Sequence, residues 1–198
     1  RVPQEAGLSP LTVTRDRESE AIVAQTLLGD VSREGENDVR HRYSSVQGTA
    51  EFSMNGTFSV RFQPGAWAKE HERSYEDASQ SCLERIDFQG TLISSESGER
   101  PGQTVLTYYQ NWEGTPLFSC QVTLLWQDDT LLRMEGQRLS GTVTSSSEEE
   151  TLSAATVLVR FLAGVTEGGF VCSRIDEMNA GYLIVSGTTR PVELTPVW

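Results

Sequence analysis

The sequence predicts an α+β fold in which two tandem β-β-α-β units follow an N-terminal helix. Each unit is expected to hold an antiparallel sheet packed by one helix. Each half of the chain contains alternating apolar strands around a tight turn and then an amphipathic helix. A repeated spacing supports the two units: the expected helix caps Ser74 and Ser147 lie 73 residues apart, as do the turn residues Gly56 and Asp129.

The predicted organisation has three parts. Residues 1–45 form a lead-in and the N-terminal helix, residues 46–113 form the first unit, and residues 114–198 form the second unit. The N-terminal helix is expected over 16–28, because apolar residues recur on one face and Gly29 ends the pattern. Its apolar stripe consists of Ala21, Val23, Ala24, Leu27 and Leu28.

The first unit begins with AEFSMNGTFSVRF, in which Asn55-Gly56 is a strong hairpin signal. A three-residue loop over 55–57 gathers the apolar side chains of both strands on one face, as a sheet packed on a helix requires. A helix follows, with Ser74 as its N-cap and Asp77 at its third position. The strand TVLTYYQNW then closes the unit. The gathered side chains are Phe52, Met54, Phe58, Val60 and Phe62, and the helix stripe is Ala78, Cys82, Leu83 and Ile86.

The second unit repeats this order. Strands over 116–126 and 131–139 flank a turn, and a three-residue loop over 128–130 again makes one face apolar. A helix capped by Ser147, with Glu150 at its third position, is expected to bury an apolar stripe. The hairpin face comprises Val122, Leu124, Trp126, Leu132 and Met134, and the helix stripe comprises Leu152, Ala155, Val159 and Leu162.

The end of the chain is expected to be extended. GYLIV over 181–185 closes the second unit, and PVELTPVW over 191–198 forms one strand beyond it, because its prolines disfavour helix. We expect Trp198 to pack against the second unit. The remaining stretches are expected to be irregular: the lead-in 1–13, the polar connector 29–42, the turn-rich stretch 92–103 and a Ser-rich link before Ser147.

The charge of the chain excludes some partners. There are 28 acidic and 16 basic residues, a net charge of −12. Nucleic acids and anionic membrane surfaces are disfavoured as ligands, because both require concentrated Lys and Arg. No apolar run reaches the roughly 18 residues of a membrane helix. The chain starts on Arg1 without a signal peptide, and we expect an N-terminal segment to precede it in the whole protein.

No motif for catalysis, cofactor binding or metal binding is found, and none of these roles is assigned to any residue. His41 and His71 are expected to be solvated surface side chains. For Cys82, Cys120 and Cys172 two interpretations stay open: three small buried hydrophobic residues, or one disulfide and a free thiol. A zinc site is disfavoured, since there is no CxxC and no His close to a Cys in the sequence.

Aromatic residues are the candidates for a partner-binding surface. In YYQNW, Tyr108 and Trp112 lie on one face of the predicted strand and Tyr109 lies on the other, and Trp67 lies in a loop before a helix. If one face is left uncovered, these rings form a patch suited to a protein partner. The alternative is core packing between the two units.

The order of these elements resembles the extracytoplasmic domain of the YycI/YycH family, and most closely its YycI member. The resemblance runs from about residue 16 to the end, and PepSY-type domains share a related layout. In the family, a further short strand follows the last one, and it is missing here. The residues that carry the resemblance are Tyr109, Gln110, Gly114, Pro116, Phe118, Gly181, Tyr182, Leu194, Pro196 and Trp198.

The resemblance implies a non-enzymatic regulatory domain on the outer face of a Gram-positive cell membrane. It also implies an N-terminal membrane helix absent from this chain, and contacts with a related regulator and with a sensor histidine kinase of a two-component system. The alternative is a ligand- or lipid-binding sensor module, and both a homodimer and a heterodimer stay open. A cell-wall hydrolase would need paired carboxylates in a cleft, for which the spacing offers no support.

Overall fold

The computed structural model describes residues 8–35, 39–146, 153–172, 174–175, 178–186 and 192–197. In chain order the elements are β1 (Leu11–Arg15), α1 (Glu18–Leu28), β2 (Ser32–Glu34), β3 (Arg40–Ser45), β4 (Gly48–Ser53), β5 (Thr57–Phe62), α2 (Tyr75–Arg85), β6 (Gly90–Ser97), β7 (Gln103–Trp112), β8 (Thr115–Gln127), β9 (Thr130–Gln137), β10 (Gly141–Ser146), α3 (Ala154–Glu167), β11 (Gly181–Ser186) and β12 (Val192–Val197).

The predicted fold of two small tandem units is wrong. The described residues are mostly strand, and their strands join into one 12-stranded sheet with only three helices. The strand order is β10-β1-β12-β11-β8-β9-β5-β4-β3-β2, and β7 and β6 branch from β8. The sheet is mixed, because β8 and β11 run parallel while the other strand pairs are antiparallel.

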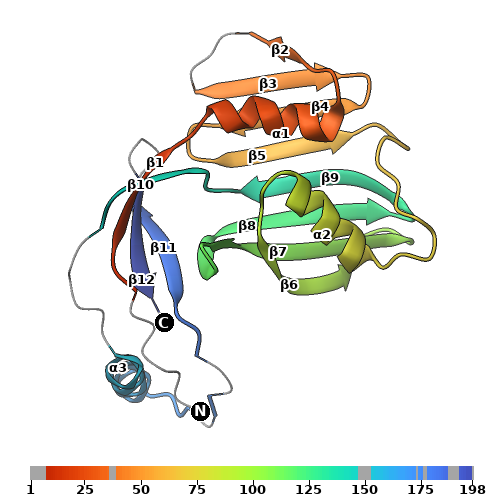
Figure 1. Ribbon diagram of the computed structural model, residues 1–198. Helices are drawn as coiled ribbons and strands as arrows, with labels where there is room; N and C mark the ends of the chain where they lie inside the picture. Colours follow the sequence, from red (N-terminus) through yellow and green to blue (C-terminus); the bar gives the residue numbers. More distant parts are fainter. Residues whose placement is uncertain are drawn as a thin grey trace.

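Strand β8 explains why the two halves fuse. It is 13 residues long, and it pairs with β7, with β9 and, at Leu117, with Tyr182 of β11. β9 in turn pairs with β5, which joins the two predicted hairpins edge to edge. The long strand therefore connects the part that carries α1 and α2 to the part formed by β1, β10, β11 and β12 (Figure 1).

The larger core lies between the helices and one face of the sheet. α1 lies over β3 and β4, and α2 lies over β6 and β7 (Figure 1). Both helices were predicted. α1 ends at Gly29, whose φ of 72° suits glycine, and α2 starts at Ser74, whose Oγ accepts the Asp77 amide at 3.0 Å. Buried in this core are Val23, Leu27, Phe52, Phe58, Val60, Cys82, Leu83, Leu124, Trp126 and Met134, among others.

A smaller core lies on one face of the first and last strands, β1 and β12. Opposed pairs such as Leu11 with Leu194 and Val13 with Val192 place alternate apolar side chains on the same face. The start of β8 covers them with Leu117 and contributes the nearby Cys120, which is also fully buried. The predicted strands over 181–185 and 191–198 are confirmed as β11 and β12, and Trp198 lies outside the described residues.

Both predicted hairpins form, with small shifts. In the first, Phe52 opposes Phe58, so the three-residue loop lies one residue earlier than predicted. The apolar face is confirmed for Phe52, Phe58, Val60 and Phe62, whereas Met54 lies in the loop. In the second, the turn has two residues rather than three. An irregularity after Leu125 pairs Trp126 with Leu131, and it is Leu131, not Leu132, that is fully buried.

Five strands occur where irregular chain was predicted. They are β1 in the lead-in, β2 and most of β3 in or beside the polar connector, β6 in the turn-rich stretch, and β10 in the Ser-rich link. The described side chains of β2 are all exposed and most of those of β6 are exposed. Such strands carry no apolar alternation, because they lie at the edges of the sheet and bury neither face.

The third helix differs most from its prediction. It begins at Ala154 with Ser153 as its N-cap, not at Ser147, which together with Glu150 and Leu152 lies outside the described residues. The spacing between Ser74 and the observed cap Ser153 is therefore not the repeated spacing that predicted two tandem units. The predicted burial is also wrong, because Val159 and Leu162 are exposed. α3 lies beside the sheet without covering either face (Figure 1).

Candidate functional site

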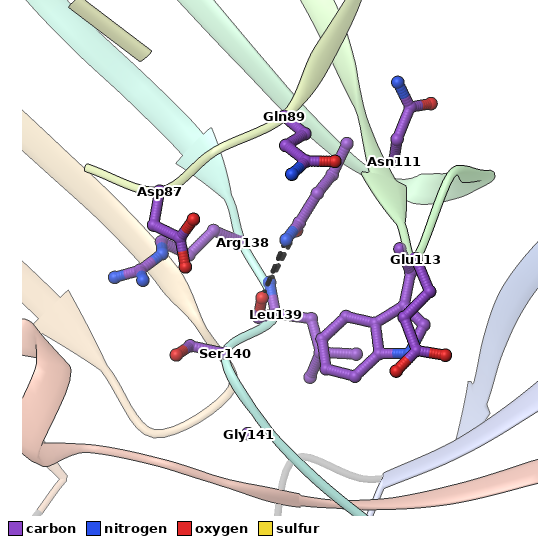
Figure 2. Close-up of a pocket in the computed structure, with 10 residues that line it drawn as sticks. Asp87, Gln89, Asn111, Glu113, Arg138, Leu139, Ser140 and Gly141 are labelled. Atoms are coloured by element: carbon purple, nitrogen blue, oxygen red, sulfur yellow. Dashed lines mark hydrogen bonds between the residues drawn. The ribbon is translucent and has the colours of Figure 1, made fainter. Parts of the chain in front are cut away.

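A polar cleft opens where three segments meet. They are the α2–β6 link (residues 87 and 89), the end of β7 with its turn (residues 110–113) and the β9–β10 link (residues 138–141). The cleft has a volume of about 280 Å³. Figure 2 shows Asp87 on one side and Glu113 on the other, with Leu139 and Ser140 between them.

The floor of the cleft is fixed by the Gln110 side chain. Its Nε2 donates to the Leu139 carbonyl at 2.7 Å, and its Oε1 accepts the Leu139 amide at 2.8 Å. Gln110 is only 4% exposed. The Gln110 amide thus pairs with the Leu139 backbone as a neighbouring strand would. It holds the β9–β10 link against β7.

Asp87 and Glu113 both adopt positive φ angles, of 55° and 49°. Asp87 follows the end of α2, and Glu113 starts the tight turn between β7 and β8. This left-handed conformation is uncommon outside glycine, and it turns the chain sharply at both sides of the cleft. Neither carboxylate forms a hydrogen bond or ion pair with the rest of the described chain.

Two buried arginines lie at the cleft: Arg138 lines it, and Arg15 contacts Arg138. Arg15 and Arg138 are 5% and 8% exposed, and Arg15 Nη1 donates to the Arg138 carbonyl at 3.3 Å. Burial lowers the pKa of both guanidinium groups. The charges of Asp87, Asp16 and Glu20, in that order, act against this shift at Arg138. The two side chains also line a second cavity of about 30 Å³, the space of roughly one water molecule.

Several buried donors in this region lack an acceptor within the described chain. They are Nε of Arg138, Nε1 of Trp112, and Nε and Nη2 of Arg15. Buried polar groups are normally paired, so this concentration of unpaired donors is unusual. No sequence pattern marks Arg15, Arg138 or Asp87, because an isolated charged residue beside a strand is usually a solvated side chain.

Two of the four aromatic residues predicted to bind a partner are packed within the fold itself. Trp67 packs against the larger core, and its Nε1 donates to the Leu27 carbonyl at 2.9 Å, with the Arg85 guanidinium over its ring. Tyr108 is 2% exposed beneath α2, and burial raises its pKa to about 12. Core packing accounts for Tyr108, and helix packing accounts for much of Trp67.

The other two aromatic residues lie elsewhere. Tyr109 packs edge-on against Phe118, with ring centroids 5.7 Å apart. Trp112 packs against the smaller core and lines the cleft. The structure therefore does not bring the four predicted aromatic residues together into one patch, and only Trp112 belongs to the cleft.

A continuous apolar stripe lies on α3 instead, exposed at Phe161 and Leu162 and half-buried at Leu158 and Val165. Leu158, Phe161, Leu162 and Val165 recur at helical spacing, so they share one face. Phe161 is 54% exposed and Leu162 39%, and beyond the helix Phe170 is 73% exposed. An apolar helix face of this size is normally buried against another element.

Within the part of the chain that the structure describes, the cysteines and histidines do not come together in one metal-binding cluster. All three cysteines are free thiols, and Cys82 and Cys120 are buried, whereas Cys172 is partly exposed. His71 is exposed, as predicted, but His41 is not: its Nδ1 lies 2.6 Å from Glu20 Oε2, and its side chain is 12% exposed. Among the described residues, no group of three His, Cys, Asp or Glu side chains is placed to hold a metal ion.

Comparison with known proteins adds no assignment: no protein-family model matches the chain, and no curated protein matches it. Within the described residues, no helix has both the length and the apolar content needed to cross a membrane.

Proposed function

We propose that this chain is a non-enzymatic regulatory domain that acts by binding another protein, as the resemblance to the YycI/YycH family implies. The proposed setting is the outer face of the cell membrane, where a preceding membrane helix would anchor the domain. The proposed partners are a related regulator and the sensor histidine kinase that it restrains. The observation that carries the proposal is the exposed apolar stripe of α3.

The stripe has the properties of a recognition helix. Leu158, Phe161, Leu162 and Val165 present large side chains over two turns, and such i, i+3, i+4, i+7 patterns bind grooves in partner proteins. Phe161 is 54% exposed, so burying its ring on binding would remove much apolar surface from water. Large exposed apolar surfaces on soluble domains mark interaction sites.

Charge specifies the partner further. The sequence around α3 is acidic, with the run Glu148–Glu150 before the helix and Glu167 at its end, and the whole chain carries −12. We therefore expect the partner surface to be an apolar groove with a rim of Lys and Arg. Because rim charges are solvent-exposed, raising the salt concentration should slow association.

The test uses the purified extracytoplasmic domain of the sensor kinase encoded in the same genome. Phe161→Asp and Leu162→Asp each place a charge in the stripe, and each should weaken binding at least tenfold in a titration experiment. Ile22→Asp is the matched control, because Ile22 is also an exposed helical aliphatic residue, 65% exposed on α1. Equal binding by all variants, or an unchanged kinase regulon after deletion of the gene, would refute the proposal.

A further inference from the structure

We propose that the free edge of β6 binds an extended segment of another protein as an added strand, and that this segment alternates apolar and basic residues. The inference goes beyond protein binding through α3, because β6 and α3 are separate surfaces. It rests on the backbone groups that β6 leaves without a strand partner within the described chain.

The outer edge of β6 is unpaired within the described chain. β6 pairs with β7 and with no other strand, and Figure 1 shows it as the outermost strand below α2. Every second residue of such a strand points its N–H and C=O groups away from the sheet, where another extended chain can bind them. Of the edge strands, β6 is the longest, at eight residues against three for β2 and six for β10.

β6 lacks most of the features that protect edge strands. Its sequence, GTLISSES, contains no Lys and no Pro. Leu92 and Ile93 are 39% and 47% exposed. The one irregularity of its pairing with β7 lies between Leu92 and Ser94, and residues 94–97 pair without interruption beyond it. Residues 94–97 therefore offer a regular edge to a new strand.

The two faces of this edge differ in chemistry. Leu92 opposes Tyr108, which is buried beneath α2, so Leu92 lies on the face that α2 covers. Glu96 opposes Val105, and both line a groove on the other face. A residue added beside Leu92 thus meets apolar surface, whereas one added beside Glu96 meets a carboxylate. Because successive residues of a strand point to opposite faces, alternating apolar and basic side chains fit this edge.

Charge favours a basic partner over a second copy of the chain. No basic residue lies in β6, and two of the three charged residues at its end, Glu96, Glu99 and Arg100, are carboxylates. On the helix face, Tyr108 Oη donates to the Glu76 carbonyl at 3.4 Å, which places the acidic first turn of α2 near this edge. Two copies would each bring a net charge of −12, so pairing of β6 with its own copy is disfavoured.

The test measures amide hydrogen exchange in residues 90–97 of the whole chain by mass spectrometry. The probe is a peptide of about eight residues that alternates Val and Lys, and the control probe alternates Val and Glu. We expect the Val–Lys peptide to slow the exchange of β6 saturably, with a dissociation constant of roughly 1 mM. The Val–Glu peptide should leave this exchange unchanged, because its carboxylates meet like charges.

Three variants separate the edge from other surfaces. Glu96→Lys should weaken binding of the Val–Lys peptide roughly tenfold, since it places on the edge the charge that protects other edge strands. Glu72→Lys is the matched control: it makes the same charge change at an exposed residue outside β6, and it should weaken binding by less than about twofold. Phe161→Asp should leave binding unchanged, so failure of this proposal is distinguishable from failure of binding through α3.

The proposal is overturned if the Val–Lys peptide leaves the exchange of residues 90–97 unchanged, if the Val–Glu peptide binds as tightly, or if Glu96→Lys and Glu72→Lys weaken binding equally. It is also overturned if exchange in β6 slows with rising protein concentration in the absence of peptide, because a second copy would then occupy the edge. Unchanged slow exchange in the buried strands of each variant shows that the fold is retained.

Discussion

The Gln110 side chain forms both hydrogen bonds of the Leu139 backbone, donating to its carbonyl at 2.7 Å and accepting its amide at 2.8 Å. Gln110 lies at the register shift of β7 against β8, and Leu139 lies between the last residue of β9 and the first of β10. A side-chain amide has the same groups as a backbone amide, so it can extend a strand ladder where the chain bends.

Gln110→Ala should therefore destabilise the protein by about 2–4 kcal/mol, because both polar groups of Leu139 would be left buried and unpaired. Urea unfolding measures this change. Gln80→Ala is the control, since the Gln80 amide donates an exposed hydrogen bond to Glu84 on α2, and it should change stability by less than about 0.5 kcal/mol. Similar effects of the two substitutions would contradict the role given to Gln110.

Gly136 is expected to tolerate no side chain. It has a φ of 152° and pairs with both Val122 and Phe58, and a Cβ there would overlap the Gln121 carbonyl oxygen and the Val122 backbone. Gly136→Ala should lower the stability by at least about 3 kcal/mol, because two backbones would have to separate.

Gly164 gives the opposite expectation. It lies inside α3 with open space around it, so Gly164→Ala should raise helix stability by roughly 0.5–1 kcal/mol. Thermal unfolding of the Gly136→Ala and Gly164→Ala variants, measured side by side, checks the expected loss of stability in the first and the expected gain in the second. A Gly136→Ala protein that melts with the unaltered one would show that the strands are less closely packed than described.

Thiol chemistry should separate the three cysteines. Cys82 and Cys120 are fully buried, whereas Cys172 is partly exposed. Since only a solvent-accessible thiolate reacts, we expect one thiol to react in the native protein and three after unfolding. A colourimetric disulfide reagent measures the count, and Cys172→Ser should remove the native reaction. A native count of two or more would mean that one of the cores opens.

The elements predicted correctly are those whose residues carry their own signal. α1, α2 and the face of the first hairpin follow from apolar periodicity, and Ser74 marks its helix by a cap. The pairings that join the strands into one sheet could not be predicted. β2 and β6 are edge strands with exposed side chains. The pairing of β11 with β8 links residues far apart in sequence.

The cleft could not be predicted from the sequence for a similar reason. Trp112 was a candidate from its strand, but Asp87 and Arg138 reach it from other parts of the chain, and nothing in their local sequence distinguishes them from surface charges. An apolar stripe was predicted for the α3 helix, but on Leu152, Ala155, Val159 and Leu162, so only Leu162 belongs to the stripe that α3 presents. Periodicity identifies an apolar face without showing what covers it, and for this reason the prediction of burial was wrong.

Alkaline pH should destabilise the fold through its buried thiols. Burial raises the pKa of Cys82 and of Cys120 from 9.0 to about 12 in the folded state. Between these values the folded chain keeps protons that the unfolded chain has released. The free energy of unfolding should thus be unaffected by these groups below about pH 9 and fall by up to about 1.4 kcal/mol per pH unit for each thiol above it.

Urea unfolding at pH 8, 9 and 10 measures this slope. The Cys82→Ala and Cys120→Ala variants should each show a shallower decline above pH 9, although each starts from a lower stability because of the space left in its core. If both variants decline as steeply as the unaltered protein, groups other than these thiols govern the alkaline loss.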